Sequence, residues 1–324
     1  MIKAPSFWFE KNSWRAKLLW PVSFLYQLGH RVRWGITTSK PSPLPLICVG
    51  NTGVGGAGKT PTALALGSLL ESMGHPYRFL TRGYGGKEKG PLIVNGFYHK
   101  AEQVGDEPLL LAKAQTTIMA KDRVQGLALI KKESAHAIIM DDGYQNPTLK
   151  KTLNILVIDG KQGFGNGCVF PAGPLRETLS MSLARASGVV VIGKASREVT
   201  KALKGLECPI FKATLMLKPP PELEKKVFPF AGIAFPDKFF NALKQEKYKL
   251  AETRSFPDHY PYEDLEFQGL RRQSRALGAT LVTTEKDYMR LSSAQRKFVT
   301  PIPVALEWED EKALEAFLKT HLFA

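Results

Sequence analysis

The sequence predicts an α/β fold in which a mostly parallel sheet carries helices on its faces. Short apolar runs recur between residues 46 and 192, and stretches with helical periodicity separate them. The first run leads through a glycine-rich loop directly into a helix, an order typical of P-loop NTPase folds. A proline-rich stretch near residue 220 precedes a second group of apolar runs, which indicates a smaller α/β lobe.

The composition is that of a globular enzyme, with 44% hydrophobic and 23% charged residues. The net charge of +15 favours an anionic partner, such as nucleic acid, an acidic membrane surface or a phosphorylated substrate. No nucleic-acid recognition motif accompanies this charge, so we expect no nucleic-acid partner. The three cysteines lie far apart and form no C-x-x-C pair, so neither a zinc site nor a disulfide framework is indicated.

The N-terminal segment, residues 1–35, is predicted to be an amphipathic helix at a membrane interface. Residues 1–40 hold seven Lys or Arg against one acid, together with four of the five tryptophans. Trp14, Leu18, Val22 and Leu25 recur at helical spacing, and a basic helix with an apolar face is typical of interfacial segments. The apolar stretch is too short to span a bilayer. An amphipathic helix packed on the protein's own core is the alternative.

The first strand of the sheet is predicted at residues 46–49, after a proline-rich entry at 39–45. Residues 53–60 then read GVGGAGKT and match G-x-x-x-x-G-K-[ST]. In such a loop the glycines let backbone N–H groups approach phosphate oxygens, the lysine reaches the β- and γ-phosphates, and the last hydroxyl ligates Mg²⁺. The predicted nucleotide-binding residues are Gly53, Val54, Gly55, Gly56, Ala57, Gly58, Lys59 and Thr60.

Further strands are predicted at 77–80, 117–119, 137–140, 155–158 and 189–192, with helices such as 108–114 and 123–131 as crossovers. The strand at 137–140 leads into Asp141 and Asp142. A carboxylate at the end of a buried strand suits a Walker-B residue, so Asp141 is a predicted Mg²⁺ ligand. A turn after the strand is the structural alternative.

The stiff segment KPPPE at 218–222 is predicted to separate the lobes. The P-loop core is then residues 36–217, and the smaller C-terminal α/β lobe is residues 218–324. Its expected strands are 228–233, 281–283 and 304–306, and its expected helices lie near 237–245, 262–276 and 310–321.

Seven short motifs, spread along most of the chain from residue 49 to residue 287, resemble those of the tetraacyldisaccharide 4′-kinase family in the family's order. These motifs are VGN at 49–51 with GGAGKTP at 55–61, RGYG at 82–85, VGDEP at 104–108, DDGYQ at 141–145, GFGNG at 163–167 with PAGPLRE at 171–177, FPDHY at 256–260, and TEKD at 284–287. The resemblance implies transfer of the γ-phosphate of ATP to the 4′-hydroxyl of an acylated glucosamine disaccharide 1-phosphate, which forms lipid IVA. It also implies Mg²⁺ as cofactor and a monomer acting peripherally at the cytoplasmic face of the bacterial inner membrane.

The resemblance further implies the acid–base residues. In the family the aspartate of the GDEP motif acts as catalytic base and pairs with the histidine of the later DH motif; the matching positions are Asp106 and His259. A carboxylate beside a weakly nucleophilic hydroxyl accepts its proton as the new bond forms, and a histidine orients that carboxylate. From the local sequence alone, Asp106 also suits a helix N-cap.

Other roles are carried over in the same way. Glu177 matches a position expected to bind Mg²⁺ and Arg176 one that contacts phosphate, with a buried salt bridge as the alternative for both. Tyr84 and Gln145 match positions near the nucleotide or the substrate. Asp142 is expected to support the metal site, and Arg123 to stabilise the transferring phosphoryl group.

The sequence departs from the family pattern at Gly53 and Ala57, where hydroxyl residues are common, and in the segment GIAFP at 232–236. A P-loop switch ATPase acting on a partner protein is the alternative function. The second early lysine or cysteine pair typical of such proteins is missing from the sequence. A GTPase is not indicated, because TEKD has the residues of a guanine-reading motif in the wrong order.

Overall fold

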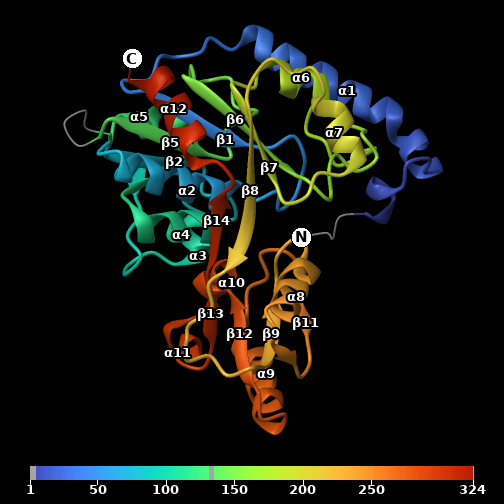
Figure 1. Cartoon of the computed structure of the whole chain (residues 1–324), viewed down its shortest axis with the longest axis vertical. Coiled ribbons are helices and arrows are strands. Elements are labelled where there is room, and N and C mark those ends of the chain that lie inside the picture. Colours follow the sequence, from blue (N-terminus) through green and yellow to red (C-terminus); the bar gives the residue numbers. More distant parts are fainter. Residues whose placement is uncertain (1–4, 131–134, 324) are drawn as a thin grey trace.

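The protein has a large domain and a small domain joined by two crossings of the chain, as Figure 1 shows. The computed structural model describes residues 5–130 and 135–323. The large domain is built on a nine-stranded sheet in the order β14-β8-β7-β6-β1-β5-β2-β4-β3. Neighbouring strands from β8 to β4 run parallel, and the edge strands β14 and β3 are antiparallel to their neighbours. The predicted mostly parallel sheet is therefore confirmed.

Most strands of the large sheet are short and largely apolar. Their bounds are β1 (Leu46–Gly50), β2 (Tyr77–Thr81), β3 (Leu92–Ile93), β4 (Thr117–Met119), β5 (Ala137–Asp141), β6 (Leu153–Asp159), β7 (Gly188–Ile192), β8 (Ile210–Leu217) and β14 (Val304–Trp308). Alternate residues of β1 enter two different cores: Ile47 and Val49 belong to one, and Leu46 and Cys48 to the other. Because successive side chains point to opposite faces, a strand buried on both faces must be apolar throughout.

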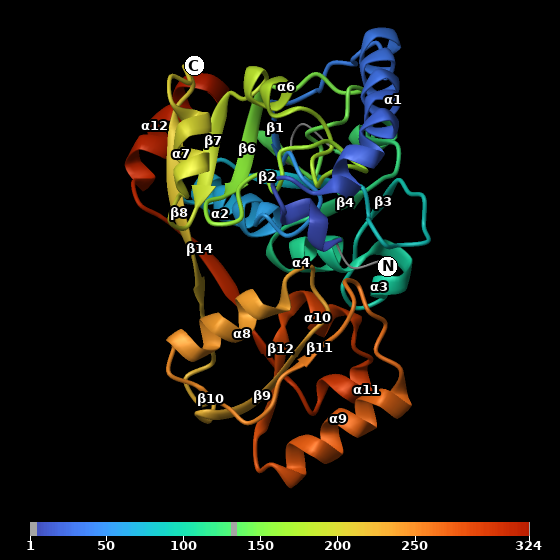
Figure 2. The ribbon, with the colours of Figure 1, turned by 90° about the vertical axis from the view of Figure 1, so that its right-hand side faces the viewer.

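Helices cover both faces of this sheet and provide the crossovers (Figure 2). Those of the large domain are α2 (Lys59–Ser72), α3 (Ala101–Val104), α4 (Asp106–Ala114), α5 (Arg123–Leu127), α6 (Leu179–Ala184), α7 (Arg197–Leu203) and α12 (Glu311–Leu322). α2 contributes Leu66 and Leu70 to the core that contains Ile47. α2 therefore packs on the same face of the sheet as Ile47.

The small domain has its own parallel sheet and two cores. Its strands are β9 (Lys226–Ala231), β10 (Lys249–Leu250), β11 (Arg254–Ser255), β12 (Thr280–Thr284) and β13 (Thr300–Ile302). Its helices are α8 (Pro236–Gln245), α9 (Asp264–Ala276), α10 (Glu285–Arg290) and α11 (Ser293–Arg296). Strand β9 lies at the centre, with Val227 in one core and Phe228 in the other. This unit is the predicted smaller lobe, with a different C-terminal boundary.

The C-terminal segment returns to the large domain, which corrects the prediction that the smaller lobe continues to residue 324. Strand β14 pairs with β8 in the large sheet instead of joining the small one. Leu314, Leu318 and Leu322 of α12 pack into the same core as Leu306 of β14. The chain therefore crosses between the domains twice, and the backbone N–H of Lys218 bonds the carbonyl of Pro303 at 2.8 Å where the two crossings meet. Local sequence identifies a strand and a helix here, but not which sheet completes them.

The N-terminal segment consists of a short 3₁₀ helix, Ser6–Phe9, and the helix α1, Trp14–Ile36. The four apolar residues that predicted a packed or membrane-bound face are all more than half exposed: Trp14 68%, Leu18 70%, Val22 51% and Leu25 64%. The buried side is narrow and contains Ala16 and Ser23. The alternative interpretation, in which this apolar face packs on the protein's own core, is therefore wrong. Among the described residues, no helix is long and apolar enough to cross a bilayer.

Candidate active site

The phosphate loop follows β1 and leads into α2, as the motif predicts. Gly58 caps α2 with a φ of 91°, and Gly55 has a φ of 123°. Side chains other than hydrogen are strained in this left-handed region, so glycine is required at both positions. A Cβ on Gly58 would also lie 2.4 Å from Ile192 Cδ1. The loop is thus shaped by its glycines and by close packing against the end of β7.

Asp141 lies at the end of β5, directly beside β1 in the sheet, where Val49 is its register partner. Its Oδ2 accepts a hydrogen bond from the Thr60 hydroxyl at 2.9 Å. Its Oδ1 is buried and has no hydrogen-bond partner among the described residues. Burial, together with the negative charge of Glu107, raises the pKa of Asp141 to about 7. A carboxylate oxygen without a partner beside a threonine hydroxyl fits a Mg²⁺ site completed by ATP phosphates, because Mg²⁺ is commonly held by one or two carboxylates.

Asp142 faces the cationic side of the site. Its Oδ1 lies 2.9 Å from Arg176 NH1 and 3.7 Å from Lys59 Nζ. Burial opposes ionisation, but these two cations outweigh it and hold the pKa of Asp142 well below its usual range. Its φ of 52° lies in the left-handed region, which Asp adopts more readily than most residues. Asp142 therefore fixes the lysine and arginine that are predicted to contact phosphate.

Arg123 lies behind this cluster at the start of α5. It is 6% exposed, and its NH2 donates to the Asp142 carbonyl at 3.2 Å. Burial, with repulsion from Arg82, lowers the pKa of Arg123 to about 10, which still leaves it charged at neutral pH. The structure therefore places Arg123 beside the predicted phosphate and metal residues.

Asp106 and His259 meet across the two domains. Asp106 is the first residue of α4 in the large domain and is 2% exposed. His259 lies in the small-domain loop after β11, and its Nδ1 is 3.1 Å from Asp106 Oδ2. The other carboxylate oxygen, Oδ1, accepts from the Glu107 backbone N–H at 2.9 Å. Asp106 is therefore both a helix-terminal residue and the partner of the predicted histidine.

The charge states of this pair follow from their contacts. Burial disfavours a charged Asp106, but the hydrogen bond from His259 and the positive charges of Lys286 and Arg290 hold its pKa well below the usual range. Burial likewise lowers the pKa of His259, whereas the hydrogen bond and charge of Asp106 raise it, with a net rise above 6.5. An ionised carboxylate beside a histidine that readily protonates is thus the state at neutral pH.

Arg290 is a residue of this site that the motifs did not identify. Its Nε lies 3.0 Å from Asp106 Oδ2, and its NH1 lies 3.2 Å from Asp287 Oδ1. Asp287 also accepts from the Tyr262 hydroxyl at 2.6 Å and the Gly232 N–H at 2.8 Å. The TEKD motif ends three residues before Arg290 on the same helix, so the one available signal was its place one turn further along α10.

Two further ion pairs cross the domains next to the contacts of Asp106. Lys286 Nζ contacts Glu107 Oε1 at 2.5 Å, and Lys113 Nζ contacts Glu285 Oε1 at 3.2 Å. α4 has its acids in the first turn and Lys113 in the last, whereas acids and bases alternate along α10, and the two helices pack against each other. These contacts fix how the small domain presents His259 and Arg290 to Asp106.

Tyr84, Gln145, Arg176 and Glu177 lie at different edges of the site. The Tyr84 ring meets the His259 ring edge-on, with centroids 5.3 Å apart. Gln145 Nε2 donates to the Asn51 carbonyl and to Glu177 Oε1, each at 2.9 Å. Both carboxylate oxygens of Glu177 also accept from Arg185 NH2, at 2.7 and 2.6 Å. Its predicted role as a Mg²⁺ ligand stays a prediction.

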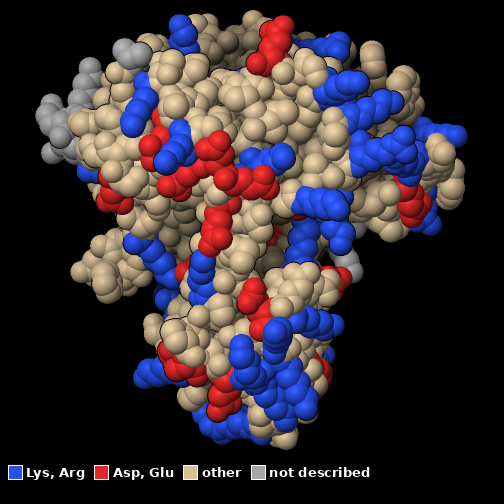
Figure 3. Space-filling model, in the orientation of Figure 1, with Lys and Arg blue, Asp and Glu red and all other residues tan. Residues whose placement is uncertain are grey.

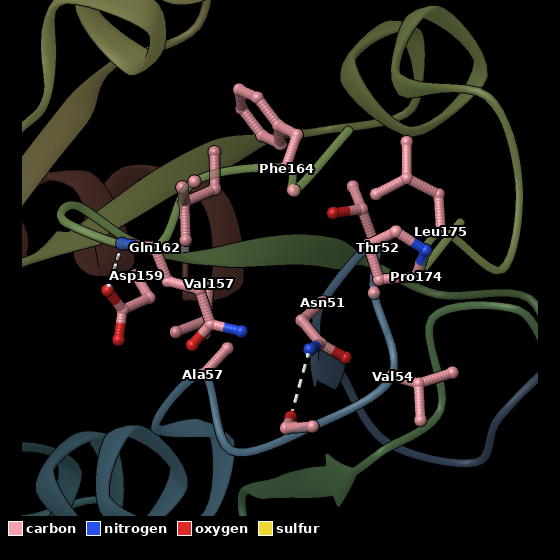
Figure 4. A pocket seen from close by; sticks show the side chains of 15 residues that line it. Asn51, Thr52, Val54, Ala57, Val157, Asp159, Gln162, Phe164, Pro174 and Leu175 are labelled. Carbon is pink, nitrogen blue, oxygen red and sulfur yellow. Dashed lines mark hydrogen bonds between the residues drawn. The ribbon is translucent and has the colours of Figure 1, made fainter. Parts of the chain in front are cut away.

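Figure 4 shows a pocket beside the phosphate loop, lined by Asn51, the end of β6 and Leu175. Asn51 Nδ2 donates to the Gly55 carbonyl at 3.4 Å and closes the base of the loop. Neither Asp106 nor His259 lines this pocket. It therefore borders the nucleotide loop but is separate from the pair that meets across the domains.

Comparisons with known proteins agree on one family along the chain. The family described as tetraacyldisaccharide-1-P 4′-kinase matches residues 15–323. A tetraacyldisaccharide 4′-kinase of Methylobacterium nodulans is 45% identical over 100% of this chain and 96% of its own length. A relative of the same name from Methylobacterium sp. is 44% identical over 98% and 97%.

A solved structure agrees with these sequences. The crystal structure of LpxK from Aquifex aeolicus, described as an "apo" form in complex with ATP, is 30% identical to this chain. The two superimpose with a TM-score of 0.77 over 95% of this chain and 99% of that one. The likeness therefore includes both domains.

Proposed function

The chain is a member of the tetraacyldisaccharide-1-P 4′-kinase family, and from that membership we propose how its own residues carry the reaction. It is an ATP-dependent kinase of lipid A biosynthesis that phosphorylates the 4′-hydroxyl of tetraacyldisaccharide 1-phosphate. The switch-ATPase alternative is disfavoured, because the family match continues through the small domain to residue 323. The observation that carries the mechanism is the contact of Asp106 with His259 between the domains.

At the donor end, the backbone of residues 53–58 cradles the phosphates and Lys59 contacts the β- and γ-phosphates. Thr60 and Asp141 are the proposed ligands of Mg²⁺, and their 2.9 Å contact already places both oxygens together. When bound with ATP, Mg²⁺ neutralises charge on the phosphate oxygens. Lys59 is oriented by Asp142, which lies 3.7 Å from its Nζ.

At the acceptor end, Asp106 accepts the proton of the 4′-hydroxyl as the new O–P bond forms and ADP departs. A low pKa makes Asp106 a weak base in the ground state. A weak base is sufficient, because the hydroxyl becomes much more acidic as its oxygen bonds phosphorus. In the loose transition state of phosphoryl transfer this bond is still weak, so the proton is transferred late. His259 orients the carboxylate through its 3.1 Å contact. Tyr84, whose ring meets His259, is proposed to border the acceptor.

Arg176 and Arg123 are proposed to stabilise the charge that spreads over the transferring phosphoryl oxygens. Arg176 is held by Asp142 at 2.9 Å and Arg123 by the Asp142 carbonyl at 3.2 Å. Asp142 thus holds two arginines and Lys59 in one place. Gln145 connects this group to the phosphate loop through the Asn51 carbonyl.

The direct test is an assay of purified protein with Mg²⁺, γ-labelled ATP and tetraacyldisaccharide 1-phosphate in mixed micelles. We expect label in a bisphosphorylated lipid, with one ADP formed for each phosphate transferred. A matched acceptor that lacks the 4′-hydroxyl should receive none. ATP hydrolysis without labelled lipid would contradict the assignment.

We also propose that the chain works as a monomer bound peripherally to the cytoplasmic face of the inner membrane. The apolar residues Trp14, Leu18, Val22 and Leu25 of α1 are exposed, and Lys and Arg side chains gather on the side where α7 and the start of α1 lie (Figure 3). Apolar groups beside cations are typical of segments in the headgroup region. A water-soluble nucleotide and a lipid acceptor can then meet at one surface.

This surface proposal is tested with vesicles that contain anionic phospholipid. Replacing Trp14, Leu18 and Leu25 together with serine should lower the vesicle partition coefficient by about a thousandfold or more, because burying each apolar side chain stabilises by roughly 1.5–3 kcal/mol and about 1.4 kcal/mol is tenfold. Leu265→Ser is the matched control, since Leu265 is 82% exposed on the small domain. An unchanged partition coefficient for the triple variant would rule out α1 as the membrane contact.

A further inference from the structure

Ser23 is the polar residue that α1 turns toward the body of the protein. It is 1% exposed, whereas Val22 and Phe24 on either side are 51% and 56% exposed. A serine in the middle of a helix favours neither the helix nor a membrane, so its burial needs another explanation. The explanation lies in the segment it touches, residues 169–176.

The Ser23 hydroxyl makes two hydrogen bonds with that segment. It donates to the Val169 carbonyl at 2.9 Å and accepts from the Ala172 N–H at 3.0 Å. The same oxygen lies 3.3 Å from the Leu19 carbonyl within the helix. One side chain therefore satisfies both a donor and an acceptor of a buried turn, which few groups other than a hydroxyl can do.

Two aromatic residues of the N-terminal segment hold the same turn. Trp8 Nε1 donates to the Pro171 carbonyl at 3.0 Å. Tyr26 meets Phe170 edge-on, with ring centroids 5.6 Å apart. The turn is thus fastened by three side chains, from the 3₁₀ helix and from α1.

The far end of the segment holds the phosphate loop. The Val54 N–H bonds the Pro174 carbonyl, and the Arg176 N–H bonds the Thr52 carbonyl, both at 2.7 Å. Leu175 forms an antiparallel bridge with Gly53. Figure 4 shows Pro174 and Leu175 directly beside Thr52.

The phosphate loop needs such support because it has few side chains of its own. Of residues 53–58, four are glycines and one is alanine, Ala57. Backbone hydrogen bonds to neighbouring segments therefore fix the position of the loop. Segment 169–176 provides two of these bonds, and its last residue, Arg176, is held at 2.9 Å from Asp142. A displacement of the turn would shift the loop and the arginine together.

We propose that Ser23 is a positioning residue that couples α1 to the phosphate loop through residues 169–176. This inference rests on the proposed function in one respect: the loop it positions is taken to bind ATP for transfer to the lipid. Helix α1 then has two separate faces. The exposed apolar face contacts the membrane, and the Ser23 face sets the geometry of the nucleotide site.

The test compares Ser23→Ala with Ser23→Thr in the full chain. Ser23→Ala leaves the Val169 carbonyl and Ala172 N–H buried without their partner, so we expect kcat/KM for ATP to fall by about tenfold. KM for ATP and the Kd of Mg-ATP, measured by titration calorimetry, should both rise, with vesicle binding unchanged. Ser23→Thr retains the hydroxyl and should restore the affinity for ATP.

Leu25→Ala is the matched control on the other face of α1, where Leu25 is 64% exposed. It should weaken vesicle binding and leave the Kd of Mg-ATP unchanged, the reverse of Ser23→Ala. If Ser23→Ala fails to fold, Trp8→Phe replaces it, because it removes the bond to the Pro171 carbonyl and keeps an aromatic ring. A smaller rise in the Kd of Mg-ATP is then expected.

An affinity for Mg-ATP within twofold of wild type in the folded Ser23→Ala or Trp8→Phe variant would overturn the proposal. A folded Ser23→Thr protein as impaired as Ser23→Ala would also overturn it, since packing and not the hydroxyl would then be responsible. Nucleotide affinity is measured without the lipid. Failure of the wild-type protein to phosphorylate the lipid would therefore count against the proposed function and leave this test intact.

Discussion

Asp106→Asn removes one charge from the contact between the domains and keeps the shape of the side chain. The amide oxygen can still accept from the Glu107 N–H, which lies 2.9 Å from Oδ1. The group that replaces Oδ2 is an NH₂, and it faces two other donors, His259 Nδ1 at 3.1 Å and Arg290 Nε at 3.0 Å. The variant therefore loses its proposed proton acceptor and the attraction that holds His259 in place.

The size of the effect follows from these contacts. Loss of a general base costs about 10²- to 10⁴-fold in kcat, or roughly 3–5 kcal/mol of transition-state stabilisation. The loss of folding stability should be smaller, about 1–3 kcal/mol. Arg290 still pairs with Asp287 at 3.2 Å and donates to the Gly232 carbonyl at 2.9 Å, so its charge is not left alone. ATP affinity should be unchanged, because Lys59 and Thr60 do not contact Asp106 in the described structure.

The assay measures transfer of labelled γ-phosphate to the lipid under saturating substrates, with titration calorimetry for Mg-ATP and thermal unfolding for stability. Asp258→Asn is the matched control. Asp258 Oδ1 lies 3.8 Å from the other ring nitrogen of His259, and its side chain is 37% exposed, so this change should alter kcat by less than about threefold. A folded Asp106→Asn protein that binds ATP and retains wild-type kcat would refute the catalytic role of Asp106.

Two further predictions address the histidine and the domain boundary. The pKa of His259 is raised above 6.5 in the folded protein, so its contribution to stability is fully present below pH 6.5 and is lost as the pH rises through the folded pKa. His259→Gln should therefore destabilise the protein most at acidic pH. A difference in unfolding free energy between variant and wild type that is constant from pH 5 to 9 would contradict this. Leu314→Ala on α12 should destabilise the large domain by about 2–5 kcal/mol in chemical denaturation, because Leu314 is fully buried in the core of that domain. If the variant destabilised the small domain alone, α12 would belong to the small domain instead.

Much of the large domain could be predicted because its strands are buried on both faces. Such strands are continuous apolar runs, and the runs at 46–49, 77–80, 137–140 and 189–192 all became strands of one sheet. The return of β14 could not be predicted in this way. Its short apolar run is equally suitable for either sheet, and pairing with β8 depends on where the two crossings bring the chain.

Some residues of the site could likewise be predicted from local sequence, and others could not. Thr60 and Asp141 were predicted from local patterns, since β1 and β5 are neighbours and their ends must lie together. Asp106 and His259 came from the family motifs, since each alone resembles an ordinary helix cap or a loop histidine. Arg290 was missed, because nothing in its local sequence distinguishes it from a surface arginine near a helix end.

The sequence by itself predicted the phosphate loop and determined which acids follow a strand, because a glycine loop and a buried strand are local features set by backbone sterics and burial. The tertiary structure decided which residues meet between domains. Asp106, His259 and Arg290 are brought together by the packing of α4 against α10, and Ser23 reaches the phosphate loop through a turn some 150 residues away. Such contacts depend on the relative placement of whole elements, which no short stretch of sequence encodes.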